Sequence, residues 1–329
     1  MKRMITGAAV VAMVAAITAP AASAQEFTLR IHTLARDPHP FNDVAKRFAE
    51  YVEAESDGRI EVRIFDAGQL GQDPAVISEI GLGTIDMMVS TSSNAAQQIP
   101  ELAIFTMPYL FADMDEIAEA LGPGTEGLAL FQQAFEDRGI GLRLLALGGS
   151  GTRNMATVAT EVTGPGDLSG LRMRTPPSPM DSETWAAFGM LPTTIAWGEL
   201  YAAMQSGLAD AFESSLPAYL GSQLFEVAPN LVLTEHVVQV HHVSMSEVTW
   251  GRLPEDLQEI VVQGAIEGNI FGMEMSKQYD GELVDRLAAE HGVTVWRPDI
   301  DEFRAILEPV KAELAERLDL MAEFTLLTE

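Results

Sequence analysis

Two arginines stand where they could hold an anion. Arg174 ends the alternating segment Leu171–Arg174, just before Thr175-Pro176-Pro177 breaks the chain, and Arg153 follows a glycine-rich run. Ligands of α/β proteins bind beyond the carboxyl ends of strands, so Arg174 is better placed than Arg172. A guanidinium fork binds a carboxylate through two parallel hydrogen bonds. The sequence therefore favours recognition of a carboxylate, with Arg174 as the first candidate.

The charge balance of the chain opposes an anionic partner. The sequence has 48 acidic and 20 basic residues, a formal net charge of −28. A surface of this sign repels nucleic acid and anionic lipid, so both are excluded as partners. It also repels an anionic ligand, and only arginines partly buried in a cleft, where screening is weak, could overcome that repulsion. Arginines at strand ends are therefore candidates for contacts with an anionic ligand.

Asp210 and Glu213 are the candidates for acid–base chemistry, and they define the main alternative function, a periplasmic hydrolase or lyase. Distance along the chain does not establish the separation of two carboxylates in space. No general base can be paired with a nucleophile. The residues favour Glu213 as a group that caps or orients another in a cleft, and no enzyme is expected. Turnover would separate the two classes, because a binding protein returns its ligand unchanged.

No metal ion and no cofactor are expected. His236, His241 and His242 form a cluster, but on a strand His241 points away from the other two, so three ligands do not converge. The segment Gly122–Gly127 matches G-x-G-x-x-G, yet it follows a predicted helix rather than a strand. The chain has no cysteine, which removes disulfides and thiolate sites.

The first 24 residues have the pattern of a secretory signal peptide. Lys2 and Arg3 precede an apolar stretch from Met4 to Ala19, and Ala22-Ser23-Ala24 is an A-x-A cleavage site. The mature chain should begin near Gln25, in the periplasm. No later segment is apolar for long enough to span a bilayer, and no cysteine can carry a lipid. The mature chain is therefore expected not to insert into the membrane.

Hydrophobic periodicity predicts two α/β domains with a cleft between them. The glycine-rich segment Gly148–Gly151 is predicted to interrupt regular structure where the chain crosses between the domains. Long helices are predicted after Pro254, the last of them from Phe303 to Phe324. The expected strands lie at 27–31, 60–65, 85–89, 141–147, 171–174 and 293–295, and the expected earlier helices at 41–52, 75–82, 117–121, 128–135, 181–188 and 199–204.

Several segments resemble the solute-binding proteins of tripartite ATP-independent periplasmic (TRAP) transporters, the DctP family. The segment Gly170–Pro176 is similar to the signature Gly-Leu-Lys-x-Arg-x-Pro. The run Trp197–Gly207, followed by Asp210, resembles the family's segment ending in "aLQtG.vDG.E". Matches of this kind extend from about Leu29 to Gln258, and they include Gly68–Gly71, Gly83–Met87 and Met107–Phe111.

The resemblance implies a two-lobed clamshell of the periplasmic-binding-protein type, with a mostly parallel sheet flanked by helices in each lobe. Lobe I would comprise residues 25–150 plus about 236–277, and lobe II residues 151–235 plus about 278–329, joined by hinge crossovers. The chain would be an extracytoplasmic solute-binding protein, and a monomer. It would capture a small organic acid (a dicarboxylate, a hydroxy or keto acid, or a sugar acid) and dock on the membrane subunits of a TRAP transporter.

The resemblance also assigns three main contacts in the binding site. In the family, the arginine of the signature forms the selective salt bridge to a ligand carboxylate, and this position is Arg174. A second arginine, in a Gly-x-Arg element about twenty residues earlier, often assists, and this position is Arg153. An aromatic wall falls on Trp197.

The other pocket positions do not identify which groups the ligand carries besides its carboxylate. A pocket side chain of the family falls on Thr91, whose neutrality argues against a ligand amine there. Ser214 replaces the asparagine that often bonds the ligand in the family. Glu213 is also expected in the cleft, and His32, Thr33 and His39 are possible donors to ligand hydroxyls.

Overall fold

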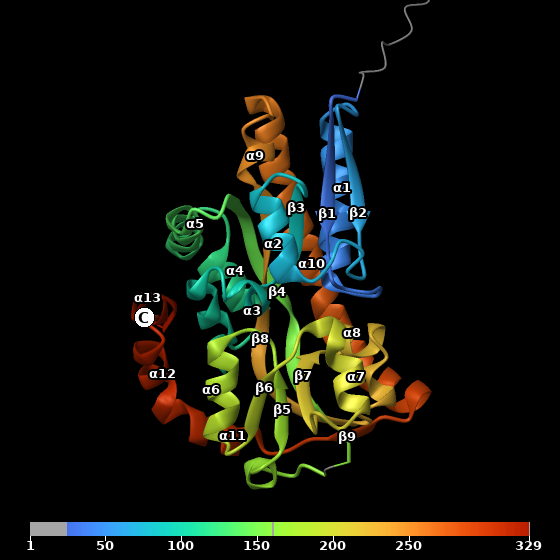
Figure 1. The fold of residues 1–329 in the computed structure, drawn as a ribbon, viewed down its shortest axis with the longest axis vertical. Coiled ribbons are helices and arrows are strands. Elements are labelled where there is room, and N and C mark those ends of the chain that lie inside the picture. The colour runs from blue at the N-terminus through green and yellow to red at the C-terminus, as the bar shows by residue number, and fades with distance from the viewer. Residues whose placement is uncertain (1–24, 160, 329) are drawn as a thin grey trace, which may run out of the picture.

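The computed structural model describes residues 25–159 and 161–328, so the predicted signal peptide at 1–24 lies outside the described residues. The described chain folds into two lobes, one above the other in Figure 1, each with strands at its centre and helices around them. Among the described helices, none combines the length and the apolar character that a membrane span requires.

One mixed sheet runs through both lobes in the order β2-β1-β3-β8-β4-β7-β5-β6, and β9 pairs with β8 (Figure 1). Pairing is antiparallel between β3 and β8, between β8 and β4 and between β4 and β7. All other pairs, β8 with β9 included, are parallel. The strands are β1 (Phe27–His32), β2 (Ile60–Phe65), β3 (Met87–Thr91), β4 (Leu142–Thr157), β5 (Arg172–Thr175), β6 (Leu191–Thr194), β7 (Ala211–Ser215), β8 (Asn230–Ser246) and β9 (Thr294–Trp296).

The two long strands β4 and β8 join the lobes. The start of β4 lies in lobe I, beside the end of β8, and its end lies in lobe II, between β7 and the start of β8. The predicted break in regular structure at Gly148–Gly151 is wrong, because β4 continues through it. The register shifts between Gly149 and Thr152, and Gly151 has φ +97. A bulge bends a strand without ending it, so these glycines mark a bend at the crossover.

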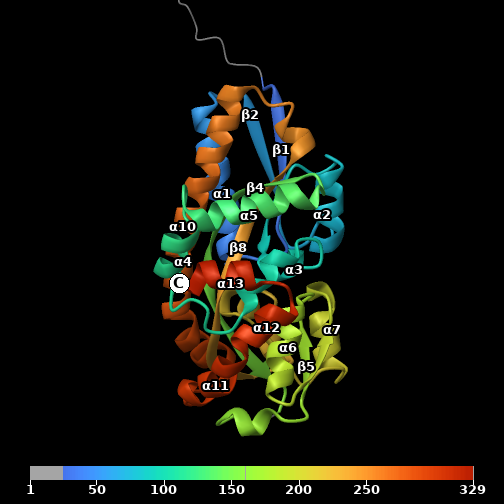
Figure 2. The ribbon, with the colours of Figure 1, turned by 90° about the vertical axis from the view of Figure 1, so that its left-hand side faces the viewer.

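Helices flank the sheet in both lobes (Figure 2). Lobe I carries the helices numbered α1 to α5 and α9, and lobe II carries α6 to α8 and α11. Their bounds are α1 (Pro40–Glu55), α2 (Asp73–Gly81), α3 (Ser92–Ala95), α4 (Met114–Leu121), α5 (Glu126–Arg138), α6 (Pro179–Ala187), α7 (Leu200–Gln205), α8 (Leu216–Gly221), α9 (Glu247–Trp250), α10 (Glu255–His291), α11 (Ile300–Leu307), α12 (Lys311–Arg317) and α13 (Met321–Thr328), with 3₁₀ turns that include η1 (Pro100–Thr106) and η5 (Glu308–Val310).

The 37-residue helix α10 is the third element shared by the lobes. Its first half packs on α1 in lobe I, and Leu283 and Leu287 near its end belong to a core of lobe II. Three glycines spaced by four residues, Gly264, Gly268 and Gly272, face α1. Residues four apart lie on one side of a helix, so the stripe lets the two helix backbones approach closely.

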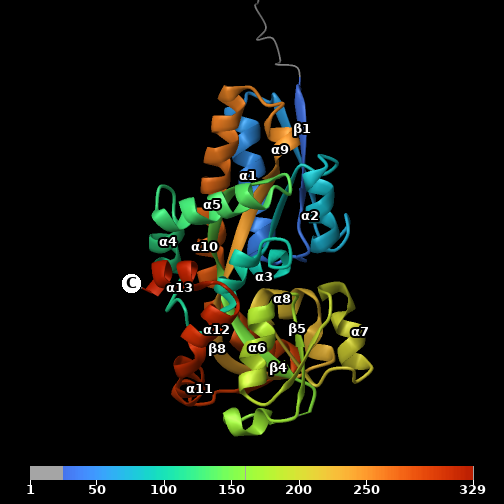
Figure 3. The ribbon, with the colours of Figure 1, turned by 60° about the vertical axis from the view of Figure 1, so that its left-hand side comes forward.

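The single helix predicted from Phe303 to Phe324 is wrong. The segment forms α11, the turn η5, α12 and α13, with breaks at Pro309 and at Asp319, which has φ 59. Proline cannot donate the hydrogen bond that continues a helix. Helix α11 packs in lobe II through Phe303, while α12 and α13 lie against lobe I at the level of the junction (Figure 3). Leu320 joins the lobe I core.

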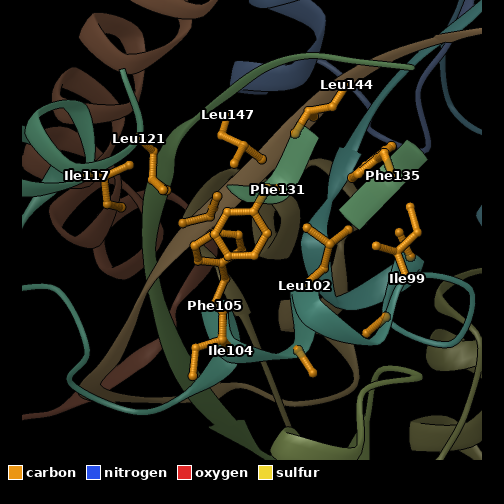
Figure 4. Close-up of a cluster of buried hydrophobic side chains, with 14 of the residues drawn as sticks. Ile99, Leu102, Ile104, Phe105, Ile117, Leu121, Phe131, Phe135, Leu144 and Leu147 are labelled. Atoms are coloured by element: carbon orange, nitrogen blue, oxygen red, sulfur yellow. The ribbon is translucent and has the colours of Figure 1, made fainter. Parts of the chain in front are cut away.

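Each lobe has its own hydrophobic cores. The largest lies between α4, α5, η1 and the sheet of lobe I, where the rings of Phe105 and Phe131 have centroids 4.4 Å apart (Figure 4). A second core joins α1 and α10 to the other face of the sheet. Two further clusters fill lobe II, one of them around the fully buried Trp185. Each lobe is therefore a stable base for side chains at the junction.

The glycine stripe of α10 gives a test of this packing. A Cβ at Gly268 would lie 2.7 Å from the backbone oxygen of Val44, whereas a Cβ at Gly281, in the same helix, would meet nothing within 4 Å. Gly268→Ala should lower the free energy of unfolding by about 1–3 kcal/mol, although alanine is the better helix former. Gly281→Ala should raise it by up to about 1 kcal/mol. Urea denaturation measures both, and equal effects would contradict the close packing.

Candidate functional site

A cleft lies where the two lobes meet. It has about 530 Å³ of empty space, part of it open to solvent. Lobe I contributes the loop after β1 and the starts of α1, α2 and α3, and lobe II contributes the ends of β5 and β7, Trp197 and α8. The polar side chains and the indole that line it include those of Arg36, His39, Asp73, Thr91, Ser93, Asn94, Arg153, Arg174, Trp197, Ser214 and Gln239.

Arg174 is the most deeply buried cation of the cleft, with 1% of its surface exposed. It lies on β5, which ends at the cleft, and its Nε donates a hydrogen bond of 2.8 Å to the carbonyl of Ile195. Its guanidinium carbon is 5.6 Å from the ring centroid of Trp197. Within the described chain, no acceptor is bonded to its two terminal nitrogens. Burial lowers the pKa of Arg174 to about 10, so it remains charged at neutral pH.

Arg153, by contrast, already has a carboxylate partner. Its Nε and Nη2 both donate to the buried carboxylate of Glu213, and Nη1 donates to Oε1 of Gln239 at 3.0 Å. The pairing follows from the sheet, because β4 and β7 run side by side with Arg153 opposite Ser215. Burial opposes ionisation of Glu213, but the charge and hydrogen bonds of Arg153 outweigh it and hold the pKa of Glu213 well below its usual range.

Two more titratable groups, His236 and Asp181, lie near this ion pair. His236 Nε2 lies 3.6 Å from Glu213 Oε2, and the imidazole packs edge-on against Trp185. Burial lowers the pKa of His236, which favours the neutral ring. Asp181 is also buried, and its Oδ2 has no hydrogen-bond partner. Burial and the charge of Glu213 raise the pKa of Asp181 to about 7.

Apart from Asp73 and the exposed Arg36 at its edge, the polar side chains of the lobe I wall are neutral. Thr91 Oγ1 and Ser93 Oγ lie 3.1 Å apart at the start of α3. His39 caps α1, where its Nδ1 accepts a hydrogen bond from the backbone of Phe41. Burial lowers the pKa of His39 to about 3, so this ring is neutral. Several neutral hydrogen-bonding groups therefore face the arginines across the cleft.

The structure brings most of the predicted site residues to one cleft. Arg174, Arg153, Trp197, Thr91 and Ser214 all line it, and so does His39.

Three predicted contacts do not line the cleft. Glu213 is fully buried and bonds Arg153, which does line the cleft. His32 bonds Asp73 at 2.9 Å and Thr33 bonds Asn42 at 2.6 Å, so both side chains have internal partners.

Sequence reasoning missed Asp73, Asn94 and Gln239. Asp73 precedes a proline at the start of a predicted helix, which is a signal for a helix terminus. That signal gives no indication that the carboxylate faces a ligand site. Of the described His, Asp and Glu side chains, no three are grouped so that they could hold a metal ion.

Comparison with known proteins shows the family of the chain. The sequence model of the bacterial extracellular solute-binding protein family 7 (DctP) matches residues 31–318, and the chain belongs to this family. A solute-binding protein of Roseobacter denitrificans is 32% identical over 289 residues, which are 88% of this chain and 85% of that protein.

Two solved structures extend the likeness to the fold. A TRAP periplasmic solute-binding protein of Roseobacter denitrificans with bound L-galactonate has a TM-score of 0.82 and 29% identity, covering 92% of this chain and 99% of that chain. One from Sulfitobacter sp. with bound α-D-taluronate has a TM-score of 0.85 and 27% identity, covering 92% and 97%.

The family fixes the class of protein. Its members are periplasmic binding proteins for sugar acids and other small organic acids, and they work with TRAP permeases. They are transport proteins and not enzymes. The expected two-lobed α/β fold is confirmed, and the alternative of a hydrolase or lyase based on Glu213 and Asp210 is set aside.

The ion pair of Arg153 and Glu213 yields a stability prediction. Glu213→Gln leaves a buried arginine without its counter-ion, so the free energy of unfolding should fall by about 3–5 kcal/mol. Asp210→Asn is the matched control, because Asp210 pairs with the exposed Arg172 and such pairs contribute little. Urea denaturation at pH 7 measures both. Equal losses in the two variants would contradict a special role for the buried pair.

Asp181 yields a pH dependence. Its folded pKa, about 7, lies above the unfolded value of about 3.9, so its neutral form stabilises the fold at low pH. That contribution is lost as the pH rises from about 4 to about 7. Asp181→Asn should therefore gain stability relative to wild type over this range, by a few kcal/mol at most. Denaturant titrations at pH 4, 5.5 and 7 measure it, with Glu183→Gln, at a partly exposed carboxylate of the same helix, as the matched control.

Proposed function

We propose that this protein captures a small organic acid through a salt bridge between Arg174 and the ligand carboxylate, and delivers it to a TRAP permease. The observation that carries the proposal is a charged guanidinium, almost fully buried at the lobe junction, whose terminal nitrogens are bonded to no protein acceptor. An unpaired buried charge is costly. A carboxylate that bonds both terminal nitrogens removes that cost and gains two charge-assisted hydrogen bonds.

Other cleft residues have distinct parts in this proposal. Trp197 forms an apolar wall and holds the guanidinium plane of Arg174 from one side. Arg153 supplements the positive potential, although Glu213 neutralises much of its charge. Thr91 and Ser214 offer neutral hydrogen bonds to the rest of the ligand. In this proposal Arg174 is the buried anchor, and it has no carboxylate partner among the described residues.

Closure of the lobes would bury the ligand. The division proposed is lobe I at 25–150 plus about 236–277 and lobe II at 151–235 plus about 278–329, with the C-terminal helices α12 and α13 reaching back to lobe I. The amide of Gly198 donates to Oε1 of Gln72 across the cleft at 3.1 Å, a contact that a hinge motion would break. The closed form would present both lobes, as a monomer, to the membrane subunits after signal cleavage near Ala24.

Replacement of Arg174 tests the proposal. Arg174→Ala should weaken binding of the carboxylate ligand by about 2–5 kcal/mol, or roughly thirty-fold to several thousand-fold. Arg172→Ala is the matched control, because Arg172 lies two residues away on β5 but is exposed and paired with Asp210. Isothermal titration calorimetry measures both, after a thermal-shift screen of organic acids has identified a ligand. Unchanged affinity in Arg174→Ala, in a folded variant, would refute the anchor.

A further inference from the structure

The wall of the cleft in lobe I holds one carboxylate, that of Asp73, which is 1% exposed and begins α2. Its Oδ2 accepts hydrogen bonds from Ser90 Oγ and, at 2.7 Å, from Asn94 Nδ2. Its Oδ1 lies 2.9 Å from Nε2 of His32. With Nε2 as the donor, His32 leaves one lone pair of Oδ1 free, because each carboxylate oxygen accepts about two hydrogen bonds.

These three protein partners fix how Asp73 can act on a ligand. The donors, and the N-terminus of α2 on which Asp73 lies, stabilise the negative charge. The carboxylate is therefore held in one orientation by protein donors and needs no counter-ion from the ligand. It can still accept a hydrogen bond through the free lone pair of Oδ1. A ligand hydroxyl group fits this description, because it donates one hydrogen bond and brings no charge.

The same carboxylate disfavours a second negative charge on the ligand. Like charges repel strongly where water is excluded. The neighbours of Asp73 in the cleft wall are neutral, namely Thr91, Ser93, Asn94 and the neutral ring of His39. Arg153 is bonded to Glu213, and Arg174 is the anchor of the first carboxylate. Among the described residues that line the cleft, no buried cation is left for a second one.

We infer that the cleft selects a hydroxylated monocarboxylate, in which Arg174 holds the acid group and Asp73 accepts a hydrogen bond from a hydroxyl, and that it discriminates against dicarboxylates. The inference rests on the proposed function and narrows its ligand class. Hydroxy acids and sugar acids have the required groups. Unsubstituted fatty acids lack the hydroxyl, and diacids place a second charge near Asp73.

Arg36 and ligand amines are the two features that could reverse this preference. Arg36 is exposed at the edge of the cleft, where it could pair with a distal carboxylate. A pair in that position is hydrated and screened, so its contribution is small. A ligand ammonium could pair with Asp73 directly. The three internal donors already occupy most of the acceptor sites of that carboxylate, which disfavours this pairing.

Four acids of one chain length separate these possibilities in the wild-type protein. D-galactonate carries one carboxylate and several hydroxyls, and galactarate keeps the hydroxyls at C2 to C5 but has a second carboxylate in place of the C6 hydroxyl. Hexanoate has no hydroxyls, and 6-aminohexanoate has a terminal ammonium. Further pairs of aldonates with their aldarates cover other stereochemistries. Calorimetric titration should give the best aldonate an affinity at least ten-fold above its aldarate, above hexanoate and above 6-aminohexanoate.

A variant tests whether Asp73 causes the preference for an aldonate over its aldarate. Asp73→Asn removes the charge at nearly constant shape, so affinity for the aldonate should fall at least ten-fold and the ratio of aldonate to aldarate affinity should narrow at least five-fold. A purely structural role would weaken both ligands equally and leave the ratio unchanged. Asp66→Asn is the control, because Asp66 lies in the preceding turn and its side chain bonds Gln69 instead of facing the cleft. It should leave the ratio unchanged.

The outcomes distinguish this inference from the proposed function. Wild-type binding of a dicarboxylate or of 6-aminohexanoate as tightly as the best aldonate would overturn the inference and leave the carboxylate anchor intact. The same holds for an unchanged ratio in a folded Asp73→Asn variant. If that variant fails to fold, the affinities of the wild-type protein for the aldonate and for the other three acids still test the inference. Absence of binding to every carboxylate would overturn both.

Discussion

A buried guanidinium without a counter-ion is the constraint on which the site depends. Arg174 is almost fully covered, and the carbonyl of Ile195 satisfies only Nε. Such a group destabilises the ligand-free protein, so stability must come from elsewhere. The four hydrophobic cores of the two lobes provide it. The negative net charge of the chain repels anions in general, so attraction for an anion is concentrated at this buried guanidinium.

The sheet topology keeps the two arginines of the cleft chemically different. Arg153 lies on β4 beside β7, so the carboxylate of Glu213 reaches it and the pair is neutral overall. Arg174 lies on β5 on the other side of β7, and its side chain points to a backbone carbonyl and an indole ring instead. One arginine therefore belongs to the framework of the cleft, while the other remains available.

The sequence predicted the parts of this site that follow from local rules. Arg174 could be placed because a strand end before Pro176 is visible in the residues themselves, and so could most helices and strands of lobe I. The pairing of Arg153 with Glu213 could not, because it depends on the register of two strands 60 residues apart. Asp73 was missed for a similar reason, since its place in the cleft wall depends on contacts with two other segments, β1 and the end of β3 with α3. The breaks in the C-terminal helix were missed because its hydrophobic period continues across Pro309.

The C-terminal segment forms a further physical link between the two lobes. Helix α11 is fixed in the core of lobe II and α12 in the core of lobe I, and only η5, the turn containing Pro309, lies between them. The chain thus crosses the junction a fourth time, after β4, β8 and α10. This last crossing acts as a short tether on one side of the cleft. In a hinge motion, its length would limit how far the lobes separate, so the width of the open cleft would be set by a segment near the end of the sequence, far along the chain from Arg174.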